Sequence, residues 1–255
     1  MDFIWYIMAG SLVGLAVGIT GVGGGSIMTP LLLMFGFPAH IAIGTDLMYA
    51  GIAKSTGVYM HAKKKHVNWS IMGAMAAGSL PSSLITVFWL SQYDTPDFYQ
   101  DILTSTLGVM LVATAFVIIF RKKLLSSRPN TTLESHHKSL KYIFFAGIVL
   151  GALVTLTSVG AGALGTALLM LLFPSMAAKN IVGTDLAHAV PLTLTAGIGH
   201  VFLGNVDYSL LVALLIGSIP AIYVGTHIST YVPKKVLQPV LATALMGFGV
   251  KYLFF

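Results

Sequence analysis

The sequence predicts an all-α polytopic membrane protein made of two inverted repeats, each with about five helical segments. The first observation is composition: among 255 residues, 56% are hydrophobic, 9% are charged, and the mean hydropathy is +0.88. These values lie far outside the range of soluble globular domains. The second observation is that the apolar residues form long runs between short polar or Pro/Gly-containing breaks. The third is that the two halves of the chain match each other.

The apolar runs predict ten helical segments. They cover residues 3–20, 26–36, 39–62, 67–90, 100–120, 141–158, 163–173, 176–202, 207–226 and 233–254. At about 1.5 Å per residue, the second and seventh segments reach only about half of a ~30 Å hydrocarbon core. Each of these two follows a glycine-rich break, so each is expected to be a half-helix in a broken or re-entrant hairpin with the segment before it.

The repeat is visible as matched residues 139 positions apart. The matches are Gly44-Thr45-Asp46-Leu47 with Gly183-Thr184-Asp185-Leu186, and Gly78-Ser79-Leu80-Pro81 with Gly217-Ser218-Ile219-Pro220. With two residues of slippage, Val22-Gly23-Gly24-Gly25 also matches Val159-Gly160-Ala161-Gly162. An odd number of helices per repeat gives the second copy the opposite polarity in the membrane. We therefore expect repeats at 1–125 and 141–255, joined by a cytoplasmic linker at 126–140.

Basic residues predict the orientation of the helices. They fall in short loops, at Lys63-Lys64-Lys65, Arg121-Lys122-Lys123 and Lys234-Lys235. The positive-inside rule places these loops in the cytoplasm, and places Asp94, Asp97, Asp207 and both termini outside. The net charge of +6 is thereby explained without a nucleic-acid partner. The expected location is the cell inner (plasma) membrane, as a multi-pass protein in the lipid bilayer.

Chemistry that depends on cysteine or a metal is not expected. The chain has no cysteine, which excludes disulfides, thiolate metal sites and thiol catalysis. His136 and His137 are paired, but no second cluster supports a metal site, so they are interpreted as part of a solvated loop. No cofactor and no catalytic residue is predicted.

The first glycine-rich break, Gly21 to Ser26, is the strongest functional signal. Four glycines in five residues cannot propagate a helix cheaply, and irregular backbone at membrane depth is tolerated only in packed protein or along a wet cavity. Half-helices that begin at Ser26 and near Ala163 would direct free N–H groups and positive dipole ends to the midplane, where an anion could bind. Close helix packing is the alternative explanation of glycine, and it is favoured for the pairs Gly10/Gly14 and Gly247/Gly249.

The predicted substrate-binding residues come from the two breaks and one intramembrane lysine. They are Gly23, Gly24, Gly25, Ser26, Lys54, Ser158, Gly160 and Gly162. Hydroxyl groups of Thr20, Ser26, Thr157 and Ser158 stand at the breaks. They either add hydrogen bonds to a substrate or bond back to a helix carbonyl, and the sequence leaves both roles open.

Asp46, Lys54 and Asp185 are charged residues inside long apolar helices, where an unpaired charge is costly. Two roles stay open for the aspartates, which are repeat partners: capping the neighbouring half-helix, or coupling transport to an ion. Lys54 breaks the symmetry, because its repeat partner is Thr193. It either faces an anion or neutralises an aspartate. His188 follows Asp185 by three residues on the same helix face and could relay protons.

Together these motifs resemble the sulfite exporter TauE/SafE family of membrane permeases. The resemblance rests on the Gly-Val-Gly-Gly-Gly break followed by Pro30-Leu31-Leu32, and on the Gly-Thr-Asp-Leu motif with its second copy, and it covers nearly the whole chain. The second break, Ser158 to Gly162, has fewer glycines than the first. Contact of both half-helices with substrate is therefore an open question.

The resemblance implies transport of a small sulfur oxyanion or organosulfonate, such as sulfite or sulfoacetate, commonly as export driven by ion gradients. The expected partners are this anion, a coupling proton or sodium ion, and a second copy in a homodimer. A passive anion channel is the first alternative, and it would show no ion coupling. An intramembrane enzyme is the second, although the chain has no Gly-x-Ser-x-Gly or His-Glu-x-x-His motif.

Overall fold

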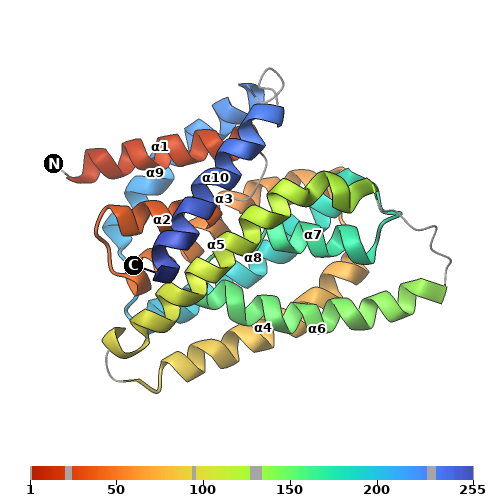
Figure 1. The fold of residues 1–255 in the computed structure, drawn as a ribbon, viewed down its shortest axis with the longest axis horizontal. Helices are drawn as coiled ribbons and strands as arrows, with labels where there is room; N and C mark the ends of the chain where they lie inside the picture. Colours follow the sequence, from red (N-terminus) through yellow and green to blue (C-terminus); the bar gives the residue numbers. More distant parts are fainter. Residues whose placement is uncertain (1, 21–24, 94–95, 127–133, 229–233, 255) are drawn as a thin grey trace.

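The computed structural model describes residues 2–20, 25–93, 96–126, 134–228 and 234–254 (Figure 1). Within these ranges the chain forms ten α-helices and no strand, which confirms the all-α prediction. The helices are α1 Asp2–Thr20, α2 Gly25–Met34, α3 Ala39–Lys63, α4 Trp69–Leu90, α5 Pro96–Ser126, α6 Glu134–Thr157, α7 Ala163–Leu172, α8 Ala178–Phe202, α9 Tyr208–Ile228 and α10 Lys234–Phe254.

Five stretches of these helices are long and apolar enough to cross a membrane. They are Trp69–Leu90, Tyr99–Phe120, Leu140–Thr157, Ala178–Phe202 and Tyr208–Ile228. A multi-pass membrane protein is therefore confirmed as the fold class.

The two predicted half-helices, α2 and α7, are short. Each has 10 residues, so each spans about 15 Å. The backbone before α7 is irregular, with φ of 57° at Ser158, 109° at Gly160 and 136° at Gly162. Glycine adopts such left-handed angles without strain, whereas Ser158 does so at a cost. Residues 21–24 of the first break lie outside the described ranges.

The central segment is more helical than expected. α6 begins at Glu134, so residues 134–140 of the expected linker, including His136 and His137, are helical. The prediction relied on polarity, but residues 134–140 contain neither glycine nor proline. Polar residues of this kind propagate a helix nearly as well as apolar ones.

Helices of the two halves pair with each other. α1 packs along α9, and α6 packs along α4, so the first helix of each half contacts the fourth helix of the other (Figure 1). α3 packs against α8, and α5 packs against α10. Each of these last two pairs joins a helix to its own repeat partner. The pairing pattern is thus unchanged when the two halves are exchanged.

Glycines let α1 approach α9 closely, and let α6 approach α4 in the same way. A Cβ atom built at Gly14 of α1 would lie 2.6 Å from Ser218 O of α9, and one built at Gly151 of α6 would collide with Ser79 O of α4. The two contacts join repeat-related positions. Such backbone contact is the close-packing role of small residues in membrane helices, and it agrees with the packing interpretation of Gly14.

α3 and α8 run antiparallel. Near the start of α3, a Cβ atom at Gly44 would collide with Asn205 O, just after α8 ends. Near the start of α8, a Cβ atom at Gly183 would lie 2.6 Å from His66 O, just after α3 ends. Two repeat partners in contact therefore point in opposite directions.

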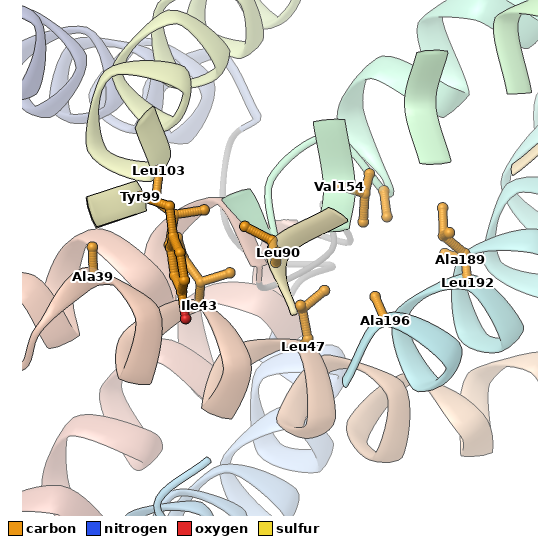
Figure 2. Close-up of a cluster of buried hydrophobic side chains, with 11 residues drawn as sticks. Ala39, Ile43, Leu47, Leu90, Tyr99, Leu103, Val154, Ala189, Leu192 and Ala196 are labelled. Atoms are coloured by element: carbon orange, nitrogen blue, oxygen red, sulfur yellow. The ribbon is translucent and has the colours of Figure 1, made fainter. Parts of the chain in front are cut away.

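A buried apolar cluster holds the two halves together beside this helix pair (Figure 2). The first half contributes Ala39, Ile43, Leu47, Leu90, Tyr99 and Leu103, and the second contributes Val154, Ala161, Ala189, Leu192 and Ala196. Ala161 belongs to the second break. The core of the molecule therefore extends directly to the irregular backbone before α7.

Candidate functional site

The Gly-Thr-Asp motif docks the start of α3 and the start of α8 onto neighbouring loops. The close approaches at Gly44 and Gly183 bring the loop backbone against each helix. Thr45 Oγ1 then accepts a hydrogen bond of 3.1 Å from Asp207 N. In the other copy, Thr184 Oγ1 accepts one of 2.9 Å from Asn68 N. Asn68 and Asp207 are the residues that precede α4 and α9, so the threonines fix where these two helices begin.

Asn68 and Asp207 complete this arrangement as helix caps. Asn68 Oδ1 accepts from Ile71 N at 3.2 Å, and Asp207 Oδ1 accepts from Leu210 N at 2.9 Å. A side chain before a helix that accepts from the N–H three residues later satisfies one of the unpaired donors of the first turn. In both halves, therefore, a motif threonine accepts a hydrogen bond from the residue before the next helix, and the side chain of that residue caps the helix.

The aspartates of the motif reach the two half-helices. Thr29 Oγ1 of α2 donates to Asp46 Oδ2 at 2.5 Å, and Thr166 Oγ1 of α7 lies 2.9 Å from Asp185 Oδ2. The two pairs are equivalent under the repeat. At α7 the backbone makes room for the carboxylate, because a Cβ atom at Gly165 would collide with Asp185 Oδ1.

Lys54 connects α3 to the second break. Its Nζ donates a hydrogen bond of 2.9 Å to Ala161 O, and its side chain is 8% exposed. Its charge also interacts with Asp185 and Asp46. The lysine thus interacts both with the two aspartates and with the backbone that leads into α7.

Three oxygen atoms around Lys54 are buried without a hydrogen-bond partner. They are Asp46 Oδ1, Asp185 Oδ1 and Ser158 Oγ. The Ser158 hydroxyl lies beside the Asp46 carboxylate. Buried polar atoms are nearly always paired, so this concentration marks the region as one where a ligand could supply the missing contacts.

His188 has a buried partner on another helix. Its Nε2 is 2.7 Å from Ser79 Oγ of α4, and the histidine is 1% exposed. The repeat-related hydroxyls of Tyr49 and Ser218 are also buried and lie beside each other, without reaching the geometry of a hydrogen bond. The same pair of positions therefore meets in both halves, and His188 Nε2 is engaged by Ser79.

The structure brings together most of the residues predicted from the sequence. Lys54, Ser158, Gly160 and Gly162 meet at the second break, and Asp46 and Asp185 lie close enough to interact electrostatically with the lysine. Gly25 and Ser26 lie in the first turn of α2. Gly23 and Gly24 lie outside the described residues, so their part in the site stays a prediction.

Sequence reasoning missed three partners and left the roles of four hydroxyls open, and the structure assigns the role of one of them, Thr157. The missed partners are Thr29, Thr166 and the carbonyl of Ala161. The two threonines carry a usable signal, since they match under the same two-residue slippage that aligns the breaks. Thr157 Oγ1 donates to Leu153 O at 2.6 Å, which is the bond back to a helix carbonyl that the sequence left open.

A polytopic helical protein with broken helices and buried charges at the breaks has the features of a membrane transporter. The family model of the sulfite exporter TauE/SafE matches residues 6–252. The chain therefore belongs to this family, as the sequence motifs indicated.

Relatives support the same class. The chain is 38% identical over 252 residues to the probable membrane transporter protein YjnA of Bacillus subtilis, covering 96% of this chain and 97% of the relative. It is 29% identical to the probable membrane transporter protein YdhB of Bacillus subtilis, covering 89% and 90%. It is 27% identical to the probable membrane transporter protein MJ0441 of Methanocaldococcus jannaschii, covering 95% and 92%. No solved structure matches the chain.

Proposed function

We propose that the protein is a secondary transporter of a small anion, a sulfur oxyanion or an organosulfonate such as sulfite or sulfoacetate. It exports this anion across the plasma membrane by alternating access. The family supports transport across a membrane. The observation that favours an anionic substrate is Lys54, a buried ammonium group that donates a hydrogen bond to Ala161 O at the entry to a half-helix.

The anion would bind where Lys54 meets the N-terminus of α7. In the structure the ammonium group is held by a neutral carbonyl, at 2.9 Å from Ala161 O. An anion is a stronger acceptor for an ammonium group than a carbonyl is, so it can take over this bond. The Ser158 hydroxyl, which has no partner, and the first N–H groups of α7 would add hydrogen bonds.

Alternating access would use the relation between the two halves. We propose that they are inverted repeats, because the contacting repeat partners α3 and α8 run antiparallel and the helix pairing is the same for both halves. In inverted-repeat transporters, one set of helices rocks against the other around a site near the midplane. The site around Lys54 lies between α3, α7 and α8, where such a movement would open it to either side.

Thermal unfolding of the purified protein in detergent tests this function. The panel is sulfite, sulfate, thiosulfate, sulfoacetate, taurine, phosphate and acetate. A ligand that binds only the native state, at 100 times its Kd, stabilises it by about 2.7 kcal/mol. We expect sulfur anions to raise the melting temperature of the wild type, and Lys54→Met to abolish that rise.

A matched control is Lys251→Met, which removes an exposed lysine of α10. This variant should keep the full response to anions. An absence of any anion response in the wild type would contradict anion transport. A full response in Lys54→Met would contradict the placement of the anion at this lysine.

A further inference from the structure

Three buried charged side chains surround the proposed anion site: Asp46, Lys54 and Asp185. Their exposed fractions are 0%, 8% and 3%. Among the side chains that the structure describes, no other Asp, Glu, Lys or Arg is buried. With all three ionised, the cluster carries a net charge of −1. An uncompensated charge at membrane depth costs about 3 kcal/mol or more, so the neutral state of the cluster, with one added proton, is favoured.

Thr166 of α7 is the hydroxyl partner of Asp185. Its Oγ1 is within hydrogen-bond distance of two acceptors, Gly162 O and Asp185 Oδ2. A hydroxyl has one proton to donate. The single Thr166 proton therefore serves two acceptors, so Asp185 has weaker hydrogen-bond support for its ionised form than a carboxylate with a hydroxyl donor of its own.

Asp46 is the carboxyl group with the better hydrogen-bond support for ionisation. Its Oδ2 lies 2.5 Å from Thr29 Oγ1, a short distance typical of a hydroxyl that donates to a charged oxygen. An ionised Asp46, a charged Lys54 and a protonated Asp185 sum to zero. The hydrogen-bond geometry and the charge balance therefore agree on the state of the site without an anion.

We infer that binding of a monovalent anion at Lys54 is linked to the uptake of one proton by this pair of carboxyl groups. The inference rests on the proposed function. A bound monoanion returns the neutral cluster to a charge of −1, and one proton from solvent restores neutrality. That proton forms an O–H bond on the carboxyl group that was still ionised, which is Asp46. Its Oδ1 has no partner, and the Ser158 hydroxyl lies beside it.

Other groups near the cluster do not change its net charge or the number of protons that it takes up. α2 and α7 contribute the neutral hydroxyls of Thr29 and Thr166. On α8, His188 is a turn beyond Asp185, and its Nε2 is engaged by Ser79 of α4. On α3, Tyr49 lies between Asp46 and Lys54 in sequence and carries a neutral hydroxyl. The helices packed on α3 and α8 bring no further buried carboxylate or ammonium group within the described side chains.

Isothermal titration calorimetry of the purified protein measures this linkage. The probes are methanesulfonate and isethionate, monoanions that stay ionised at neutral pH and so release no proton themselves. Titration in two buffers with different ionisation enthalpies gives the number of protons taken up per anion bound. We expect one proton per anion for the wild type.

Variants locate the proton. Asp46→Asn and Asp185→Asn should each still take up one proton per anion, because the remaining carboxyl group neutralises Lys54 before binding and is protonated after it. The double variant Asp46→Asn/Asp185→Asn should bind the anion without proton uptake. His188→Gln removes a neighbouring titratable side chain and should keep a count of one.

The outcomes separate the inference from the function on which it rests. Anion binding to the wild type with no dependence on buffer overturns the inference and leaves anion binding intact. A count of zero in His188→Gln also overturns it, since the proton would then belong to the histidine. No heat of binding with either sulfonate, together with no thermal response to any anion of the panel, contradicts both. The wild-type measurement alone decides if the double variant does not fold.

Discussion

Each residue of the repeated Gly-Thr-Asp motif has a separate structural task. The glycine leaves room for the backbone of the neighbouring loop. The threonine accepts a hydrogen bond from the residue before the next helix, and the aspartate is hydrogen-bonded to a threonine of the half-helix. The same tasks occur at Gly44, Thr45 and Asp46. The motif is therefore the point where a long helix, a loop and a half-helix are joined, which explains why it occurs once in each half.

Replacing the motif threonine should destabilise the fold. Thr184→Val removes the acceptor for Asn68 N but keeps the side-chain shape, so it leaves a partly buried donor unpaired. We expect a loss of about 1–3 kcal/mol in the free energy of unfolding, seen as a lower melting temperature in detergent. Thr243→Val is the control, because that exposed hydroxyl only bonds back to Pro239 O of its own helix. Equal melting temperatures for the two variants would contradict the role of Thr184.

The charged residues of the candidate site could be predicted from the sequence, but their partners could not. Asp46, Lys54 and Asp185 stand out because charge inside an apolar helix requires an explanation. Thr29 and Thr166 give a weaker signal, since threonine in such helices commonly bonds to its own backbone, and only their match under the repeat distinguishes them. The carbonyl of Ala161 has no sequence signal at all, because every residue carries one. Partner choice depends on which helices meet, and that is a non-local property.

At the scale of elements, glycine determines which helices approach closely. Gly14 faces the backbone of Ser218, and Gly151 faces that of Ser79. Neither backbone can move aside as a flexible side chain would. Gly247 of α10 contrasts with both, because a Cβ atom there would meet nothing within 4 Å. The packing interpretation of the pair Gly247/Gly249 thus fits Gly249, where a Cβ atom would lie 2.7 Å from Val112 Cγ2, but not Gly247.

Alanine substitutions should separate these glycines. Gly14→Ala and Gly151→Ala force their helix pairs apart, and overpacking of this kind typically costs about 1–3 kcal/mol. Gly247→Ala should be neutral or stabilising, because alanine is the better helix former by about 1 kcal/mol. Melting temperatures of the three purified variants in detergent measure the difference. Destabilisation by Gly247→Ala as large as that by Gly14→Ala would show that helix contact is not the cause.

Helix positions were largely predictable, whereas helix pairing was not. Apolar runs end at polar or Pro/Gly breaks, so most bounds fall within a few residues of those expected. The exceptions are α5, which extends from Pro96 to Ser126 where 100–120 was expected, and α6, whose polar first turns begin at Glu134. The packing of α1 on α9 and of α6 on α4 could not be predicted from local sequence. A helix with a nearly uniform apolar surface does not indicate which face meets which neighbour.

At the scale of the molecule, the first helix of each half packs mainly along the fourth helix of the other half. α1 lies along α9, and α6 lies along α4 (Figure 1). Residues 1–125 and 141–255 therefore interlock and do not form two separate bundles. Because α3 and α8 also run antiparallel, an exchange of the two halves reverses the direction of each helix in that pair. In a membrane, this relation would place repeat-related loops on opposite sides.

Single cysteines at repeat-related positions test this inverted arrangement. Ser70 at the start of α4 and Ser209 at the start of α9 are 139 residues apart, and both are exposed. The chain has no cysteine of its own, so the unsubstituted protein is an unlabelled control. We expect an impermeant maleimide to label Ser209→Cys in intact cells, and Ser70→Cys only after permeabilisation, because Ser70 follows the basic loop at Lys63 to Lys65. Labelling of both from the same side would contradict the inverted repeat, and with it alternating access by exchange of conformation between two inverted halves.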